Sequence, residues 1–105
     1  MVRKKVIFPG QIRFDWDKGN FNKNRLRHGV ECNECEELFF NKPLIVSEDG
    51  IHSNLTENRF KALGITNNKR CLFTVFTIRG EKIRIISARD QNRKERIFYK
   101  GGVKK

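Results

Sequence analysis

The chain has 105 residues, which suits one compact domain, because two domains of half that size would each have too small a core. Its 23 lysines and arginines against 12 aspartates and glutamates give a formal net charge of +11. This charge exceeds what solubility requires and favours a polyanionic partner such as nucleic acid. No apolar run is long enough to span a bilayer, and the basic start lacks a signal sequence, so we expect a cytoplasmic protein with three free cysteines.

The charge is unevenly distributed along the chain. Lys42 is the one base between Glu31 and Glu57, a stretch that contains seven acids, so all other bases lie outside it. We expect residues 1–10 to be a basic N-terminal extension and residues 101–105 a basic C-terminal tail. The part between them, residues 11–100, is predicted to be a single domain.

The first predicted elements are a strand and a helix. Residues 12–16 alternate apolar and polar side chains, which predicts a short half-buried strand. Asp17 is a suitable N-cap for a helix that runs to about residue 28, and Gly29 follows its expected end.

A second helix is predicted over residues 31–40, with Cys32 and Cys35 on its apolar stripe. Residues 44–46 follow a proline and predict a short strand at or near a sheet edge. The polar segment 47–58 is predicted to be a loop.

The second half of the chain predicts an antiparallel meander. Three β-rich runs, at residues 60–66, 71–78 and 82–88, are separated by turn sequences, and the apolar middle run predicts a strand covered on both faces. Residues 90–99 then predict a helix that Gly101 ends. The whole pattern predicts an α+β fold, in which strand, helix and helix precede a mostly antiparallel sheet with a C-terminal helix.

The last predicted strand and helix are strongly basic. Eight bases and three acids lie between residues 79 and 100. Strict alternation puts Arg84 and Arg89 on opposite faces of their strand, which otherwise has the pattern of a buried one. Because a buried guanidinium needs an anion, each arginine either binds a phosphate of the substrate or forms a structural pair, for example with Glu95 or Asp15.

Two aromatic residues have both a functional and a structural interpretation. Metal-independent RNA cleavage needs a base for the 2′-hydroxyl, cations for the phosphorane and an acid for the leaving oxygen, and His28 could be that acid or base. Alternatively, His28 could cap the end of its helix. Trp16 could stack on an unpaired base, or it could be a core anchor.

A metal site is the weakest of the candidate sites. The spacing of His28, Cys32 and Cys35, with Cys71 as a fourth ligand, is compatible with zinc. The two cysteines of the second helix also fit as small core residues, and the neighbouring glutamates would oppose thiolate formation. A zinc-stabilised interaction domain therefore remains an alternative, although we expect no metal.

An ordered set of short motifs resembles one known family. The sequence contains Phe14-Asp15-Trp16-Asp17, Asn24, Arg27-His28-Gly29-Val30, Glu57-x-Arg59, Leu63-Gly64, Ile83-Arg84-Ile85-Ile86-Ser87-Ala88-Arg89, Glu95-Arg96 and Tyr99. These motifs stand in the order typical of BrnT toxins, and they span residues 14–99. The N-terminal extension is longer than is usual in that family, and Arg27 stands where lysine is common.

The resemblance implies a RelE-like fold and a metal-independent endoribonuclease that cleaves RNA and arrests translation, with no cofactor. It also implies a BrnA-like antitoxin, which neutralises the toxin in a complex of two copies of each and binds operator DNA. No membrane association is expected.

The resemblance also indicates which residues form the site. The expected catalytic residues are His28, Arg59, Arg84, Arg89 and Glu95, with the arginines holding the phosphate and His28 or Glu95 moving protons. Further RNA contacts are expected from Trp16, Lys23, Arg27, Arg79, Arg93 and Tyr99. The alternative is a non-catalytic RNA- or DNA-binding module, which the same charge distribution would support.

Overall fold

The computed structural model describes residues 11–50, 53 and 57–103, so the predicted basic extension lies outside the described residues. The element order is α1 (Lys23–His28), α2 (Cys32–Glu37), the 3₁₀ helix η1 (Leu38–Phe40), β1 (Ile45–Asp49), β2 (Arg59–Ile65), β3 (Cys71–Arg79), β4 (Lys82–Asp90) and α3 (Arg93–Val103). The predicted α+β class is confirmed.

The four strands form one antiparallel sheet in the order β1-β2-β3-β4. The predicted meander of three strands is therefore confirmed, and so is an edge strand after Pro43. That edge strand is longer than predicted, because pairing with β2 continues to Asp49, within the segment expected to be a loop.

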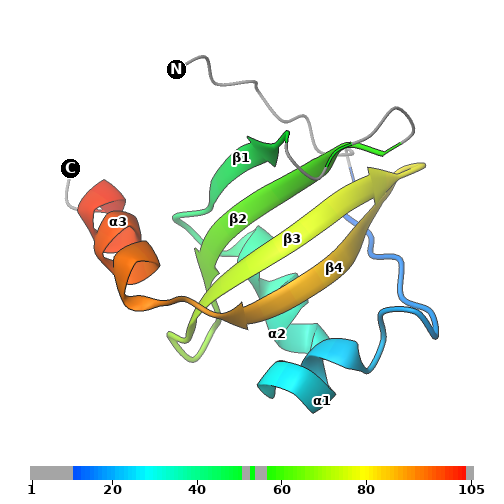
Figure 1. Ribbon diagram of the computed structural model, residues 1–105, viewed down its shortest axis with the longest axis horizontal. Helices are drawn as coiled ribbons and strands as arrows, with labels where there is room; N and C mark the ends of the chain where they lie inside the picture. Colours follow the sequence, from blue (N-terminus) through cyan, green and yellow to red (C-terminus); the bar gives the residue numbers. More distant parts are fainter. Residues whose placement is uncertain (1–10, 51–52, 54–56, 104–105) are drawn as a thin grey trace.

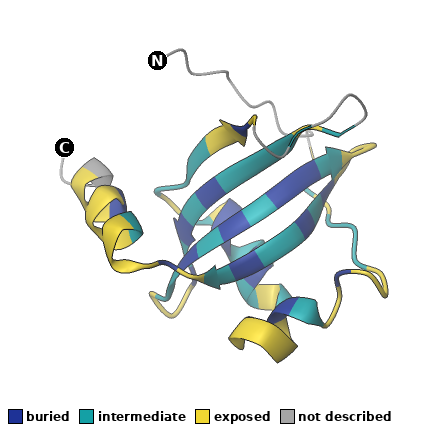
Figure 2. Ribbon diagram, in the orientation of Figure 1, coloured by how far each residue is buried: buried dark blue, intermediate teal, exposed yellow. Residues whose placement is uncertain are grey.

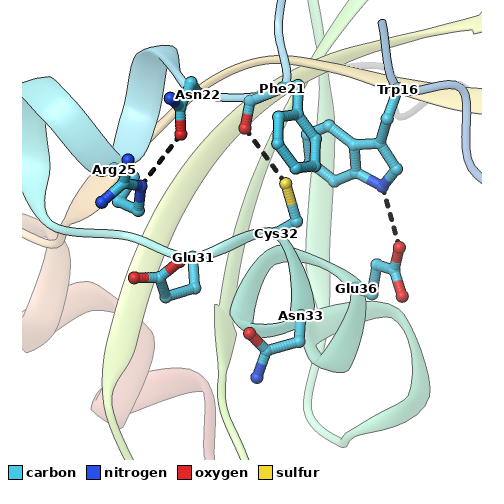
Figure 3. Close-up of a pocket in the computed structure, with 8 residues that line it drawn as sticks. All are labelled: Trp16, Phe21, Asn22, Arg25, Glu31, Cys32, Asn33 and Glu36. Atoms are coloured by element: carbon cyan, nitrogen blue, oxygen red, sulfur yellow. Dashed lines mark hydrogen bonds between the residues drawn. The ribbon is translucent and has the colours of Figure 1, made fainter.

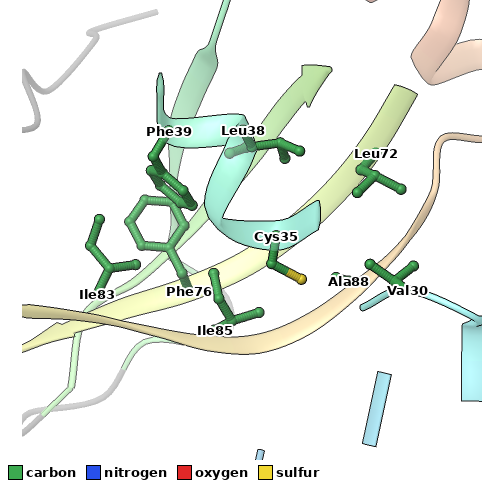
Figure 4. Packing of buried hydrophobic residues seen from close by; sticks show 10 residues of the cluster. Val30, Cys35, Leu38, Phe39, Leu72, Phe76, Ile83, Ile85 and Ala88 are labelled. Atoms are coloured by element: carbon green, nitrogen blue, oxygen red, sulfur yellow. The ribbon is translucent and has the colours of Figure 1, made fainter. Parts of the chain in front are cut away.

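The sheet is covered on one face by helices. In Figure 1, α2 lies behind the sheet and α1 lies beside the outer edge of β4, whereas α3 lies beyond the strand ends near the finish of β4. The core fills the space between α2, η1 and the sheet, where Leu38, Leu72, Phe76, Ile83 and Ile85 have no exposed area (Figure 4). Burial of this apolar area is the main stabilising contribution to the fold.

The apolar sequence of the middle strand, β3, had predicted that both of its faces are covered. In the part of the chain that the structure describes, helices cover only one face. Along β3, buried Leu72 and Thr74 alternate with half-buried Phe73 and Val75, and Figure 2 shows the same alternation of colours. The prediction was wrong because apolar composition alone does not report whether a second layer covers the sheet.

A β-bulge in β4 changes which side chains share a face. The register pairs Phe76 with Ile85 but Val75 with Ser87, so Ile86 is an extra residue without its own partner. The bulge shifts the alternation by one residue. Arg84 and Arg89 therefore lie on the same face of the sheet, and the expectation of opposite faces was wrong.

The segment before α1 is less regular than predicted. Instead of a strand at residues 12–16, Phe14 forms a single parallel bridge with Ile83 at the outer edge of β4. The helix begins at Lys23, not after Asp17, because Gly19 and Asn20 are poor helix formers and residues 18–22 form turns.

The side chains of two asparagines form hydrogen bonds with backbone groups at the outer edge of β4. Asn20 Nδ2 donates hydrogen bonds to the carbonyls of Asp15 and Ile85, and Asn24 Oδ1 accepts one from the amide of Ala88. These bonds occupy backbone groups that an edge strand would otherwise leave unpaired, and they fix α1 and the preceding turn against β4.

The predicted second helix is confirmed in position. It begins with a capping box, in which Glu31 and Glu34 each accept a hydrogen bond from the other's backbone amide, and its last turn is 3₁₀. The helix packs closely on β2, where a Cβ at Gly64 would lie 2.8 Å from Leu38 Cγ.

The C-terminal helix extends beyond its predicted end. Gly101 was expected to stop it, but α3 continues to Val103, and Gly101 does not adopt a positive φ. A glycine ends a helix mainly when it takes the left-handed conformation, as Gly29 does after α1. None of the helices described here is long and apolar enough to span a membrane.

Candidate functional site

The face of the sheet that points away from α1 and α2, called the open face below, brings together several cationic side chains. The strand register determines which residues lie on this face, because alternate residues of each strand point to the same side. In β2 its polar members are Arg59 and Lys61, and away from the ends of β3 its polar member is Thr77. In β4 after Lys82 they are Arg84, Ser87 and Arg89.

Arg84 is held by two acids from the segment before α1. Its Nη1 and Nη2 donate hydrogen bonds of 3.0 and 2.9 Å to the two carboxylate oxygens of Asp17, and Asp15 Oδ2 lies 3.6 Å from Nη1. The hydrogen bond from Arg84 lowers the pKa of Asp17. A Cβ at Gly19 would lie 3.1 Å from both Arg84 Nη2 and Asp17 Oδ1, so a larger residue there would have to displace this ion pair slightly.

Arg89 forms a similar pair with Glu95 at the other end of the open face. Its Nη1 and Nη2 donate to the two oxygens of Glu95 at 2.8 and 3.0 Å, while the guanidinium carbon lies 4.2 Å from the centre of the Phe73 ring. Glu95 also accepts from the amide of Asn92 at the start of α3. The hydrogen bond from Arg89 lowers the pKa of Glu95, so this carboxylate is ionised at neutral pH.

Arg59 is the third predicted catalytic arginine on this face. Its Nε donates to Glu57 at 3.0 Å, and Glu57 also pairs with Arg79 at 3.4 Å. Arg59 lowers the pKa of Glu57 through that hydrogen bond. Arg59 and Arg84 both stand opposite Thr77, on either side of β3, and Arg89 stands opposite Phe73.

The register gives the dimensions of this face. Strands lie ~4.8 Å apart, so the Cα atoms of Arg59 and Arg84 are separated by about 10 Å. Thr77 and Phe73 are four residues apart in β3, which places the row of Arg89 about 13 Å from the row of Arg84. The structure therefore brings four of the five predicted catalytic residues, Arg59, Arg84, Arg89 and Glu95, to one side of the sheet.

The fifth, His28, is not brought to this face. It is the exposed last residue of α1, its carbonyl accepts a hydrogen bond from Arg70, and its charge acts on Asp90. Asp90 and Arg89 are consecutive in β4 and so point to opposite sides of the strand. The expected helix-end position of His28 is confirmed, and Gly29 provides the left-handed C-cap.

Trp16 borders a groove that does not include the open face (Figure 3). This open groove, of about 590 Å³, lies between the segment before α1 and α2, and its lining includes Phe21, Cys32 and the acids Glu31 and Glu36. Trp16 is half-buried, and its Nε1 donates a 2.8 Å hydrogen bond to Glu36. The lining also includes one base, Arg25, so the groove offers a phosphate fewer cations than the open face does.

The remaining predicted RNA contacts differ in accessibility. Arg27, Arg79 and Arg93 are exposed and Lys23 is half-buried. Tyr99 is only 2% exposed, and its hydroxyl donates to the carbonyl of Pro43 at 2.6 Å. Tyr99 therefore fixes α3 against the segment before β1, and its ring is too deeply buried in this structure for a base to stack on it.

The cysteines are packed as parts of the structure. Cys35 is fully buried in the core, and burial raises its pKa to about 12, while Cys32 Sγ donates to the carbonyl of Phe21. In the described part of the chain, no three histidine, cysteine or acidic side chains converge as metal ligands would. The zinc interpretation of His28, Cys32, Cys35 and Cys71 therefore has no geometric support.

Comparison with known proteins identifies the family. Residues 16–95 match the family model described as the ribonuclease toxin BrnT of type II toxin–antitoxin systems. The chain belongs to the BrnT family. No curated protein matches the sequence.

The match to the BrnT model includes the whole open face and ends at Glu95. Within that range, the sequence analysis missed two residues that lie on the open face or pair with a residue of that face. Asp17 was interpreted as a helix cap, but it is the main partner of Arg84. Lys61 was not selected, although it stands two residues after Arg59 in a predicted strand, a spacing that puts both side chains on one face.

Proposed function

We propose that this BrnT-family protein is a metal-independent endoribonuclease that uses the open face to cleave RNA. The observation that supports this most directly is the placement of Arg59, Arg84, Arg89 and Glu95 on one face of the sheet. Three guanidinium groups offer bidentate hydrogen bonds to phosphate oxygens, and they can stabilise the negative charge of a phosphorane.

In this mechanism Glu95 is the general base. Its carboxylate takes the proton of the 2′-hydroxyl, whose oxygen attacks the adjacent phosphorus while the bond to the 5′-oxygen breaks. The products are a 2′,3′-cyclic phosphate and a 5′-hydroxyl, which receives its proton from water. Phosphate oxygens replace the carboxylate of Glu95 as acceptors for Arg89, which leaves Glu95 free to accept the proton.

His28 has a different role in this proposal. Because it lies at the end of α1, beside Asp90 and away from the open face, it does not take part in proton transfer. With exposed Arg27, it belongs instead to the basic last turn of α1.

The biological part of the proposal follows the family. RNA cleavage arrests translation, and a BrnA-like antitoxin neutralises the toxin in a complex of two copies of each, binding operator DNA through the antitoxin. The antitoxin must cover a cationic face, and α3 beside it exposes Ile97 and Phe98 by 63% and 59%. A partner with acidic and apolar residues is suited to this combination. The RelE-like assignment of the fold stays a prediction.

The test uses purified protein and single-stranded RNA in the presence of EDTA, with and without ribosomes. We expect fragments that end in a 2′,3′-cyclic phosphate. Binding that weakens with salt but leaves the RNA intact in both conditions would instead favour the non-catalytic nucleic-acid-binding module. Loss of folding on chelation would support the zinc-stabilised domain.

A further inference from the structure

The centre of the open face is occupied by Lys61. In β2 it pairs with Ser47 of β1 on one side and with Val75 of β3 on the other, and Val75 in turn pairs with Ser87 of β4. Residues paired across neighbouring strands form rows. One row contains Arg59 and Arg84, another contains Arg89, and Lys61 lies in the row between these two. Its side chain is half-buried.

The charge of Lys61 differs from that of the three arginines around it. Arg84 is paired with Asp17, Arg89 with Glu95 and Arg59 with Glu57. Within residues 11–50, 53 and 57–103, no carboxylate forms an ion pair with Lys61. Its positive charge acts on Glu95, whose pKa it helps to lower, without a direct contact. Each arginine must exchange a carboxylate for a phosphate, whereas Lys61 has no such ion pair to break.

The spacing of the rows fits an extended nucleic-acid strand. Rows on one face of a strand repeat every two residues, about 6.6 Å apart. This spacing is similar to that between successive phosphates of an extended single strand. An RNA that runs along β3, between β2 and β4, could place one phosphate between Arg59 and Arg84, the next near Lys61 of β2 and the next near Arg89 of β4.

We propose that Lys61 binds the RNA backbone phosphate at the centre of the open face, next to the scissile phosphate at Arg89. This inference rests on the proposed function, because it assigns a substrate contact within the same face. A lysine ammonium is a flexible point charge, which suits a backbone phosphate that must be held without being recognised by sequence. Lys61 is a binding residue in this proposal and does not transfer protons.

The experiment compares Lys61→Met with Lys42→Met, which removes the same charge from an exposed position between η1 and β1. Binding is measured with a 2′-O-methyl single strand, which cannot be cleaved, across a range of salt concentrations. We expect Lys61→Met to bind about tenfold more weakly at low salt, as for the loss of one charge-assisted contact. The slope of log K against log salt should fall by about 0.7. Lys61→Arg should restore both values.

Cleavage assays separate this inference from the proposed function. With cleavable RNA, Lys61→Met should raise KM and leave kcat within about twofold, because uniform binding is lost. Equal salt slopes for Lys61→Met and Lys42→Met would overturn the inference, whether or not the unaltered protein cleaves RNA. An unaltered protein that binds but never cleaves would overturn the proposed function alone. If Lys61→Met does not fold, Lys61→Thr removes the charge with a residue that suits a strand.

Discussion

Arg70 and Arg89 are both arginines paired with carboxylates, but they lie in different kinds of surroundings. Arg70 donates hydrogen bonds to Asp90 and Glu34 and also to the carbonyls of His28 and Gly29. It thereby joins the end of α1, the start of α2 and the end of β4. Arg89 has one carboxylate partner, a ring beneath it and the carbonyl of the next residue.

This difference indicates which arginine can exchange its partner. A phosphate can replace Glu95 at Arg89 because both anions offer two oxygens in a similar geometry. At Arg70 the same exchange would also remove the hydrogen bonds to the last carbonyls of α1. An ion pair therefore does not by itself mark a functional site, and the number of elements that the arginine connects is more informative.

The largest expected effect comes from Arg89→Ala. It should lower kcat for RNA cleavage by about 10²–10³-fold, as for removal of a group that stabilises transition-state charge. Circular dichroism should show an unchanged fold. Arg13→Ala is the matched control, because Arg13 is exposed and its ion pair with Glu81, at 3.5 Å, is exposed as well. Cleavage by Arg89→Ala at the rate of the control would remove Arg89 from the site.

The next effect in size concerns Glu95. Glu95→Gln should lower kcat by about 10²-fold, because a general base is lost. In the unaltered protein without RNA the pKa of Glu95 is lowered by Arg89, so kcat/KM, which reports the free enzyme, should fall only as the pH drops below the ordinary range of a glutamate. A pH–rate profile with an unchanged acid limb in Glu95→Gln would show that another group is the base.

The same carboxylate links folding stability to pH. Its pKa is lower in the folded chain than in the unfolded chain, so its stabilising effect is complete above the unfolded pKa and is lost as pH falls through the folded value. The melting temperature of the unaltered protein should therefore decrease more steeply below about pH 4.3 than that of Glu95→Gln.

A smaller effect, on stability instead of rate, is expected for Arg70→Ala. Loss of its charge-assisted hydrogen bonds should lower the free energy of unfolding by about 2 kcal/mol. Thermal unfolding should show a melting temperature lower by roughly 8–16 °C. The cleavage rate of the folded fraction should stay within about twofold of the unaltered protein. A loss of activity with unchanged stability would reverse the contrast between Arg70 and Arg89.

The sequence predicted the parts of the fold that depend on local patterns. β-rich runs separated by turn residues identified β2, β3 and β4, and the apolar stripe at Cys35 and Leu38 identified α2. These predictions succeed because β-rich composition, turn sequences and helical periodicity are properties of short segments. The helix starting at Asp17 was wrong because Gly19 and Asn20 oppose it locally, and the turn is fixed by contacts with β4.

The site was only partly predictable, because its geometry depends on distant contacts. The bulge at Ile86 carries no local sequence signal, yet it decides that Arg84 and Arg89 share a face. Asp17 and Arg84 are 67 residues apart, and no spacing rule connects them. Arg70 follows a turn without any motif, and only the folded chain brings it to both helices.

The smallest expected effect is that of Trp16→Phe, and it tests which surface binds RNA. The variant loses the hydrogen bond to Glu36 but keeps an aromatic ring, so the free energy of unfolding should fall by about 1 kcal/mol. RNA affinity should not change, because the groove beside Trp16 has two acids, Glu31 and Glu36, against one base, Arg25, while the cations of the open face lie elsewhere. Titration of a 2′-O-methyl single strand measures this, with Lys61→Met for comparison. A stronger loss of affinity in Trp16→Phe than in Lys61→Met would indicate that RNA binds in the groove and not on the sheet.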